Sequence, residues 1–234
     1  MEIIDSSNEE ALLTAIKKYE HAVALRLIRK GCNINFVGEN RETALTIATQ
    51  KKMYILMSFL ISQNVFLDNQ SDSGMTAIMH AAMSRDTKAF DILFEAGANL
   101  NIENNLKKTV LTYAAAAGSE EMVSKLVKKN VNVNHKDNSN WNPLVWATLH
   151  KHQNVVKILT QNGANFVNIE NFGGFYLNNA IKLGEIEIAK YLVNAGAYIY
   201  HFDENNKSAF QLASDAGYRD LIIEMVNNNN SLID

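Results

Sequence analysis

The sequence predicts an all-α repeat solenoid of seven 33-residue units, each with two short antiparallel helices and an extended excursion. An alanine returns every 33 residues, at Ala15, Ala48, Ala81, Ala114, Ala147, Ala180 and Ala213. Sixteen residues later stands glycine or asparagine, which tolerate the left-handed backbone past a helix: Gly31, Asn64, Gly97, Asn130, Gly163, Gly196 and Asn229. An apolar residue always lies three positions before the alanine, at Leu12, Leu45, Ile78, Leu111, Leu144, Leu177 or Phe210. The chain is therefore expected to be one domain, 1–234, with units at about 5–37, 38–70, 71–103, 104–136, 137–169, 170–202 and 203–234.

The stretch 71–101 shows how one unit is expected to fold. A turn cluster at 71–74 leads to Thr76, which is placed to cap a helix over 77–84. The pattern breaks at 85–87, and a second helix is expected over 88–96, because its apolar residues have helical spacing. Gly97 ends this helix. Helices this short are marginal alone in water, so each unit must bury its apolar faces against the next.

The two ends of the chain carry polar residues that suit terminal units of a solenoid. Acidic residues precede or begin the first predicted helix, where they favour its dipole: Glu2, Asp5, Glu9 and Glu10. Asn227–Asn230 is expected to stop the last helix. The acidic N-terminus has no apolar run and predicts no signal peptide.

Composition sets wide limits on function. Apolar residues make up 47% of the chain and charged residues 20%, and the net charge is −3, so nothing global indicates nucleic acid or an anionic membrane. No stretch approaches the length of a transmembrane helix. The single Cys32 suits a reducing compartment and is expected to be a small buried residue, not a nucleophile. We therefore expect a cytoplasmic protein, with secretion by a leaderless route as the alternative. We also expect no cofactor and a monomer when free.

The repeats resemble the ankyrin repeat family, whose pattern is roughly G-x-T-P-L-H-x-A-A, a second helix, and then G-A-D-V-N. The matching positions are Gly74, Thr76, Ile78, Ala81, Ala82, Gly97, Ala98, Leu100 and Asn101. The resemblance covers nearly the whole chain. It implies an ankyrin-type array with β-hairpin fingers at right angles to the helix pairs, and a concave binding surface formed by the finger tips and first helices.

The sequence also departs from the family pattern. The proline survives only at Pro143, and the histidine, which in the family ties the turn to the helix, is replaced in every unit. The replacements are Leu13, Thr46, Met79, Thr112, Val145, Asn178 and Gln211. The asparagine of the last motif is Val167 in one unit and Tyr200 in another.

Trp141 is the strongest candidate for a binding residue. It lies in a predicted finger among asparagines and a serine, where a tryptophan has little to pack against, and an exposed rigid aromatic is a typical interface anchor. The alternative is that Trp141 folds onto its own finger or onto Pro143. Trp146 and Tyr113 are expected in the core between repeats, with a polar edge showing. The full predicted partner-binding set is Met75, Leu106, Lys107, Lys108, Lys136, Trp141, Leu149, His150, Phe172, Asp203 and Glu204.

Charge is distributed unevenly along the array. Residues 105–160 contain eight lysines and three acidic residues, a net charge of +5. Residues 165–234 contain four basic and nine acidic residues, a net charge of −5. Finger lysines beside aromatics indicate a recognition strip, whereas Lys125, Lys128 and Lys129 are expected on an outward-facing helix.

These observations favour a non-catalytic protein-binding module that uses the concave face of repeats three to six, formed by their fingers and first helices. It would act by occupying its partner, as an adaptor or as an inhibitor or immunity-type protein. The alternative is a metal- or ligand-binding protein or small enzyme that uses His150 and His152, although residues two apart do not share a helix face. Known catalytic motifs are absent from the sequence, which predicts no enzyme and no metal site. A third alternative is nucleic-acid binding through the basic central band, although acidic residues flank it.

Overall fold

The computed structural model describes residues 6–165 and 172–230. The chain divides between Val110 and Leu111 into two compact units, which we call the first and the second unit. The side chains of Ser6, Ser7, Phe172, Asn229 and Asn230 lie outside this description. The first unit contains α1 (Ser6–Lys17), α2 (His21–Arg29), a 3₁₀ turn (Glu39–Arg41), α3 (Ala44–Gln50), α4 (Tyr54–Ser62), α5 (Ala77–Met83) and α6 (Thr87–Glu95). The expectation of a single domain stays a prediction.

The second unit continues the same alternation of short helices. It contains α7 (Val110–Ala116), which begins at the boundary, α8 (Glu120–Val127), α9 (Pro143–Leu149), α10 (Gln153–Gln161), α11 (Phe172–Lys182), α12 (Ile186–Asn194), α13 (Ala209–Asp215) and α14 (Arg219–Asn230). No β-strand occurs in the described residues, so the predicted all-α class is confirmed.

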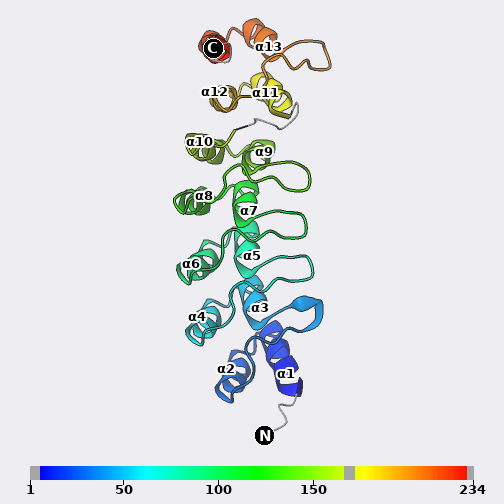
Figure 1. The fold of residues 1–234 in the computed structure, drawn as a ribbon, viewed down its shortest axis with the longest axis vertical. Helices are drawn as coiled ribbons and strands as arrows, with labels where there is room; N and C mark the ends of the chain where they lie inside the picture. Colours follow the sequence, from blue (N-terminus) through cyan, green and yellow to red (C-terminus); the bar gives the residue numbers. More distant parts are fainter. Residues whose placement is uncertain (1–5, 166–171, 231–234) are drawn as a thin grey trace. The chain divides into compact units, whose positions relative to one another are not determined.

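Within each unit the helices form two layers (Figure 1). In the first unit, α1, α3 and α5 pack in sequence in one layer, and α4 packs beside α6 in the other. In the second unit, α9, α11 and α13 form one layer, and α8, α10, α12 and α14 form the other. Consecutive helices such as α1 and α2, or α9 and α10, pack against each other and so join the two layers.

The residues that recur every 33 positions make the core between these helices. All seven alanines of the series are buried, which lets neighbouring helices approach closely. The leucines of the second helices are buried at Leu60, Leu93, Leu126, Leu159 and Leu192, as is Met225 in the last helix pair. Leu27 and Phe210, near the two ends of the chain, are only half-buried.

The predicted helix stops are confirmed for six of the seven glycines and asparagines. The φ angle is positive at Gly31, Asn64, Gly97, Asn130, Gly163 and Gly196. The prediction was wrong at the C-terminal end, because α14 continues through Asn227–Asn230.

The start of the helix pair in 71–101 also differs from prediction. Thr76 is the residue before α5, but its side chain makes no capping hydrogen bond. The second helix begins at Thr87, because Asp86 caps it by accepting a hydrogen bond from the N–H of Ala89 at 3.1 Å. The residues 85–87, predicted only as a break, therefore contain a helix start.

At the N-terminal end, Glu9 does more than favour the dipole of α1. Its carboxyl group is buried, and Oε1 accepts a hydrogen bond from the N–H of Asn33 at 3.2 Å. Glu9 thus connects α1 to the loop that follows α2. Glu10 is exposed, and Glu2 and Asp5 lie outside the described residues.

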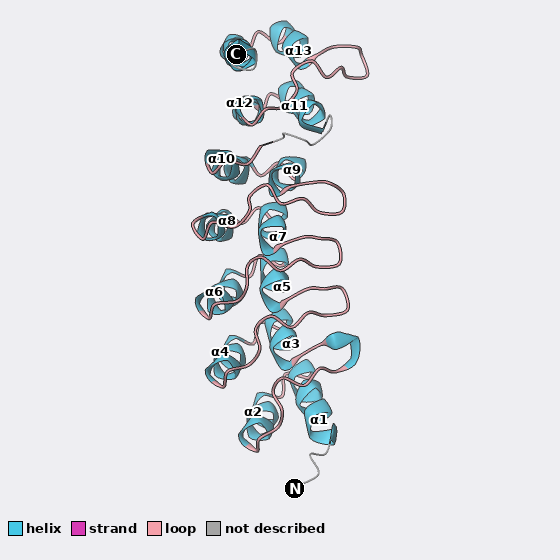
Figure 2. Cartoon of the chain, in the orientation of Figure 1, coloured by secondary structure: helices cyan, strands magenta, loops and turns pink. Residues whose placement is uncertain are grey.

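The excursions between helix pairs, which we call fingers, are tight turns and contain no β-hairpin strands in the described residues (Figure 2). In the finger of 104–108, the N–H of Asn104 donates to the carbonyl of Lys108 at 3.0 Å, and the N–H of Lys107 donates back to Asn104 at 2.8 Å. The fingers of 71–75, 137–141 and 203–207 have the same two bonds. An isolated β-bridge joins Phe202 and Ser208, so pairing stops before a ladder forms.

Successive fingers are joined by a repeated hydrogen bond from a side chain to the main chain. The side-chain oxygen of one finger accepts the backbone N–H of the next: Asn35 from Phe66 at 2.7 Å, Asp68 from Asn99 at 2.9 Å, and Asn134 from Asn165 at 2.9 Å. We call these bonds finger tethers. Each tether links the two fingers that it joins.

Candidate protein-binding surface

Asp137 organises the finger that carries Trp141. Its Oδ1 accepts hydrogen bonds from the backbone N–H groups of Ser139 at 2.9 Å and Trp141 at 3.1 Å. Asparagine and aspartate favour such turns because a short side-chain acceptor reaches the backbone two residues on. The backbone of Trp141 is therefore held in one place.

The second carboxylate oxygen of Asp137 fixes a neighbouring aromatic side chain. The indole Nε1–H of Trp146 donates to Oδ2 at 2.8 Å, and Asp137 is buried. Trp146 lies on α9. The N-terminus of this helix is stabilised because Asn142 accepts a hydrogen bond from the N–H of Val145 at 3.1 Å and Pro143 occupies the first turn. Asp137 thus connects the finger to the helix behind it.

Four aromatic rings form a continuous row along this part of the second unit. Trp141 packs edge-on against Trp146, with ring centroids 5.0 Å apart and planes at 61°. Trp146 stacks on His150, and His150 stacks on His152, each at 6.0 Å. We call Trp141, Trp146, His150 and His152 the aromatic row. Both tryptophans and His152 are half-buried, and His150 is exposed.

Trp141 packs on Trp146 of the helix that follows its finger, and part of its side chain stays accessible. Its role as a binding residue stays a prediction. Trp146 is half-buried, and the N–H at its polar edge is hydrogen-bonded to Asp137. Leu149, at the end of the same helix, is exposed as predicted.

The role of Asp137 was not predicted from the sequence. A signal for it was present, because Ser71, Asn104, Asp137 and Asp203 share one repeat position and are all turn-forming residues.

The predicted partner-binding residues of the first unit differ in exposure. Leu106 and Lys107 are exposed, and Lys108 is half-buried, on the turn that Asn104 organises. Lys107 has a φ of 56°, in the left-handed region where the other fingers have Gly74, Asn140 or Asn206. Met75 is buried, and its sulfur lies 3.5 Å from the amide nitrogen of Asn104, so its prediction as a surface contact is wrong.

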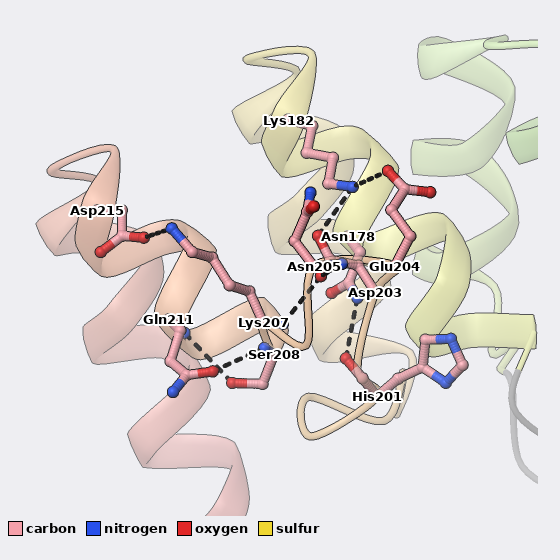
Figure 3. A network of polar contacts seen from close by, with 10 residues as sticks. All are labelled: Asn178, Lys182, His201, Asp203, Glu204, Asn205, Lys207, Ser208, Gln211 and Asp215. Carbon is pink, nitrogen blue, oxygen red and sulfur yellow. Dashed lines mark hydrogen bonds and ion pairs between the residues drawn. The ribbon is translucent and has the colours of Figure 1, made fainter.

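The two acidic residues Asp203 and Glu204, both labelled in Figure 3, also differ in exposure. Asp203 Oδ1 accepts the backbone N–H groups of Asn205 and Lys207, and Oδ2 lies 2.8 Å from Nζ of Lys182. The Lys182 hydrogen bond, with the backbone donors, lowers the pKa of Asp203. The Asp203 side chain is only 6% exposed, whereas that of Glu204 is 81% exposed. Asp203 is therefore a structural residue, contrary to the prediction, and Glu204 remains accessible.

The other predicted residues have simpler positions. Lys136 is half-buried, immediately before Asp137. Phe172 begins α11, but its side chain lies outside the described residues. Cys32 is half-buried, and burial, together with the nearby charge of Glu9, raises the pKa of its thiol to about 11. A thiol with so high a pKa is a poor nucleophile at neutral pH.

In the described part of the chain, His150 and His152 are not joined by further side chains into a set of metal ligands. The part of the chain that the structure describes contains no group of three or more His, Cys, Asp or Glu side chains placed to hold a metal ion. Nε2 of His152 lies 3.1 Å from the carbonyl oxygen of Ala116, so this ring joins α9–α10 to the preceding helix pair. Over the described ranges, every helix is too short or too polar to cross a bilayer.

Comparison with known proteins gives a consistent result for family and fold. The family model described as ankyrin repeats (3 copies) matches residues 12–104 and 96–171, which is more than half of the chain. The crystal structure of the human ASB11 ankyrin repeat domain is similar, with a TM-score of 0.67 and 22% sequence identity, over 93% of this chain and 96% of that one. No curated protein matches the sequence.

Proposed function

Because this chain belongs to the ankyrin repeat family, we propose that it is a non-catalytic binding module that acts by occupying a partner protein, as an adaptor or an inhibitor. Ankyrin repeats mediate protein–protein interactions, and domains built from them are typically not enzymes. The observation that carries the proposal is the aromatic row, in which two tryptophans are presented on a finger and helix that Asp137 locks together.

The aromatic row has the properties of an interface anchor. Tryptophan buries a large area and loses little side-chain entropy, and here the hydrogen bond to Asp137 sets the orientation of Trp146 before binding. His150 and Leu149 extend accessible surface beside it. The partner is expected to present an apolar group to the row and acidic groups to Lys136. Leu106, Lys107 and Lys108 lie in the other unit and are proposed as separate contributors.

The test uses partners recovered by affinity purification from the native cell, followed by binding kinetics on the purified pair. Trp141→Ala is expected to weaken binding by about 2 kcal/mol or more, mainly through faster dissociation. Because Trp141 also packs on Trp146, this variant is expected to melt at a lower temperature. Leu149→Ser and His150→Ala therefore provide second probes that leave the tryptophan pair in place.

The matched control is Ile55→Ser, which removes an apolar side chain of high exposure from α4 in the first unit. It is expected to change neither affinity nor partner. If Trp141→Ala, Leu149→Ser and His150→Ala all recover the same partners with unchanged dissociation rates, the aromatic row is not the binding surface.

A further inference from the structure

The turns that join the two helices of each pair carry opposite charge in the two units. In the first unit they lie at 17–22, 50–55 and 83–88, where six basic and two acidic residues give a net charge of +4. The corresponding residues of the second unit contain three basic and six acidic residues, a net charge of −3. They are 116–121, 149–154, 182–187 and 215–220. We call the three turns of the first unit the basic edge.

The three turns of the basic edge lie side by side. Nζ of Lys51 is 5.1 Å from the centroid of the Tyr19 ring, which brings the first turn against the second. The hydroxyl of Tyr54 donates to the carboxylate of Asp86 at 3.1 Å, which brings the second against the third. Asp86 is buried, whereas Glu20 is exposed. The basic side chains of the three turns therefore form one continuous surface.

The backbone of these turns indicates that their large side chains have a function. The φ angle is 61° at Tyr19, 57° at Lys52 and 54° at Arg85, in the left-handed region that glycine adopts without strain and other residues do not. At this place three of the four turns of the second unit have glycine: Gly118, Gly184 and Gly217. Glycine would thus suit the fold better at all three positions of the basic edge. Strained positions of this kind are typical of functional sites.

The basic edge also combines uncompensated charge with exposed apolar side chains. Lys52 and Arg85 are exposed, and no described residue forms an ion pair with either of them. Each turn carries one large apolar side chain of high exposure, at Tyr19 (54%), Ile55 (82%) and Met83 (53%). Side chains this exposed project from the surface, so a partner meets their tips and not a groove between them.

We propose that the basic edge binds the surface of a membrane that contains anionic lipids, with its lysines and arginine at the headgroups and Tyr19, Ile55 and Met83 reaching between them. Basic side chains are attracted to anionic lipids, and inserted apolar side chains add the second contribution that stable attachment requires. Five of the six basic residues are lysines, which act as point charges and suit a diffuse negative surface. A flat partner can reach the tips of all three turns at once. This surface lies in the first unit and does not depend on the aromatic row.

The test measures co-sedimentation of the purified protein with vesicles. One set contains phosphatidylcholine alone, and the other contains phosphatidylcholine with phosphatidylserine. The protein is expected to bind the anionic vesicles and not the neutral ones, and the bound fraction is expected to fall as salt rises.

The variants Lys52→Gly and Arg85→Gly separate binding from stability. Each is expected to weaken binding to the anionic vesicles by about fivefold, the effect of one basic residue near such a surface. Each is also expected to melt at or above the wild-type temperature, because glycine relieves the left-handed backbone. A loss of binding by a protein that is at least as stable cannot result from unfolding.

The matched control is Lys151→Gly, which makes the same substitution at the equivalent turn of the second unit, where φ is 59°. It is expected to leave vesicle binding unchanged. Ile55→Ser tests the apolar contribution without a change in charge, and it is expected to weaken binding to the anionic vesicles as well.

Four results would overturn the proposal. The protein binds neutral and anionic vesicles equally, or Lys52→Gly and Arg85→Gly bind as wild type does. Lys151→Gly weakens binding as much as they do, and then net charge alone is responsible. Finally, polyglutamate or duplex DNA binds wild type more tightly than the anionic vesicles do, and then the partner of the basic edge is a soluble polyanion.

Discussion

Asp137 has one function that it shares with its repeat counterparts and one that it does not. Its Oδ1 closes the finger turn, as Asn104 does through the N–H groups of Leu106 and Lys108 at 3.0 and 2.9 Å. Its Oδ2 accepts the indole N–H of Trp146. Asparagine can supply the first interaction but not the second, because its amide nitrogen is a donor. The carboxylate of Asp137, rather than an amide, is therefore needed for the hydrogen bond to Trp146 and not for the turn.

Asp137→Asn is expected to lower the free energy of unfolding by about 1–3 kcal/mol, since two donors then face each other in a buried place. Urea unfolding followed by tryptophan fluorescence measures both the stability and the environment of the indoles. Asp203→Asn is the matched control, because Lys182 keeps its ion pair with Glu204. Equal losses for the two variants would contradict the role given to the Trp146 bond.

At the scale of the element, two helix starts show how this chain compensates for the missing family histidine. Before α3, Thr43 accepts the N–H of Thr46 at 3.2 Å, and the hydroxyl of Thr46 accepts the N–H of Thr43 at 2.8 Å. Ser208 and Gln211 make the same reciprocal pair before α13. Thr46 and Gln211 occupy the histidine position. These two helices thus regain a tie between turn and helix as a capping box.

Thr43→Ala is expected to lower the free energy of unfolding by about 1 kcal/mol, because it removes the cap of α3. Thr76→Val is its counterpart before α5, where the buried hydroxyl has no hydrogen-bond partner. This substitution is expected to be neutral or stabilising, since an unsatisfied polar group is replaced by a methyl group of similar shape. Chemical denaturation of both variants measures the difference, and a larger loss for Thr76→Val would contradict it.

The sequence predicted the helices well because their signals are local. The recurring alanines and apolar residues alone place the helix pairs, and the glycines and asparagines mark most of their ends. It did not predict the aromatic row, because the row depends on the side-chain directions of Trp141 and Trp146. A buried hydrogen bond from Trp146 to Asp137 sets its direction, and periodicity carries no information about such a bond. Met75 and Asp203 were misjudged for the same reason.

On the scale of the whole molecule, charge changes sign along the chain. The net charge is +5 over 105–160 and −5 over 165–234, while the total is only −3. Opposite fields of this kind affect the rate and orientation of approach more than the strength of the final complex. The charges and the aromatic row are therefore expected to control different steps of binding.

Reversal of Lys107, Lys108 and Lys136 to glutamate is expected to slow association with the partner, and the defect should shrink as salt rises toward about 1 M, where the Debye length is about 3 Å. Surface plasmon resonance at several salt concentrations measures this. The matched control reverses Lys128 and Lys129, which are exposed just past the end of α8. If the control slows association as much, net charge alone is responsible, and the finger lysines have no special role.

The finger tethers have a consequence for how the gene can change. Each tether joins a side chain in one repeat to a main-chain N–H in the next, so it requires no particular side chain on the receiving side. Phe66, Asn99 and Asn165 receive it equally well. Recombination that duplicates, deletes or transposes a whole 33-residue block would therefore keep the joint intact wherever the preceding block carries Asn or Asp at the accepting position, as at Asn35, Asp68 and Asn134. Heritable change in the length of this protein is expected to proceed in units of one repeat, without mutations at the new junction.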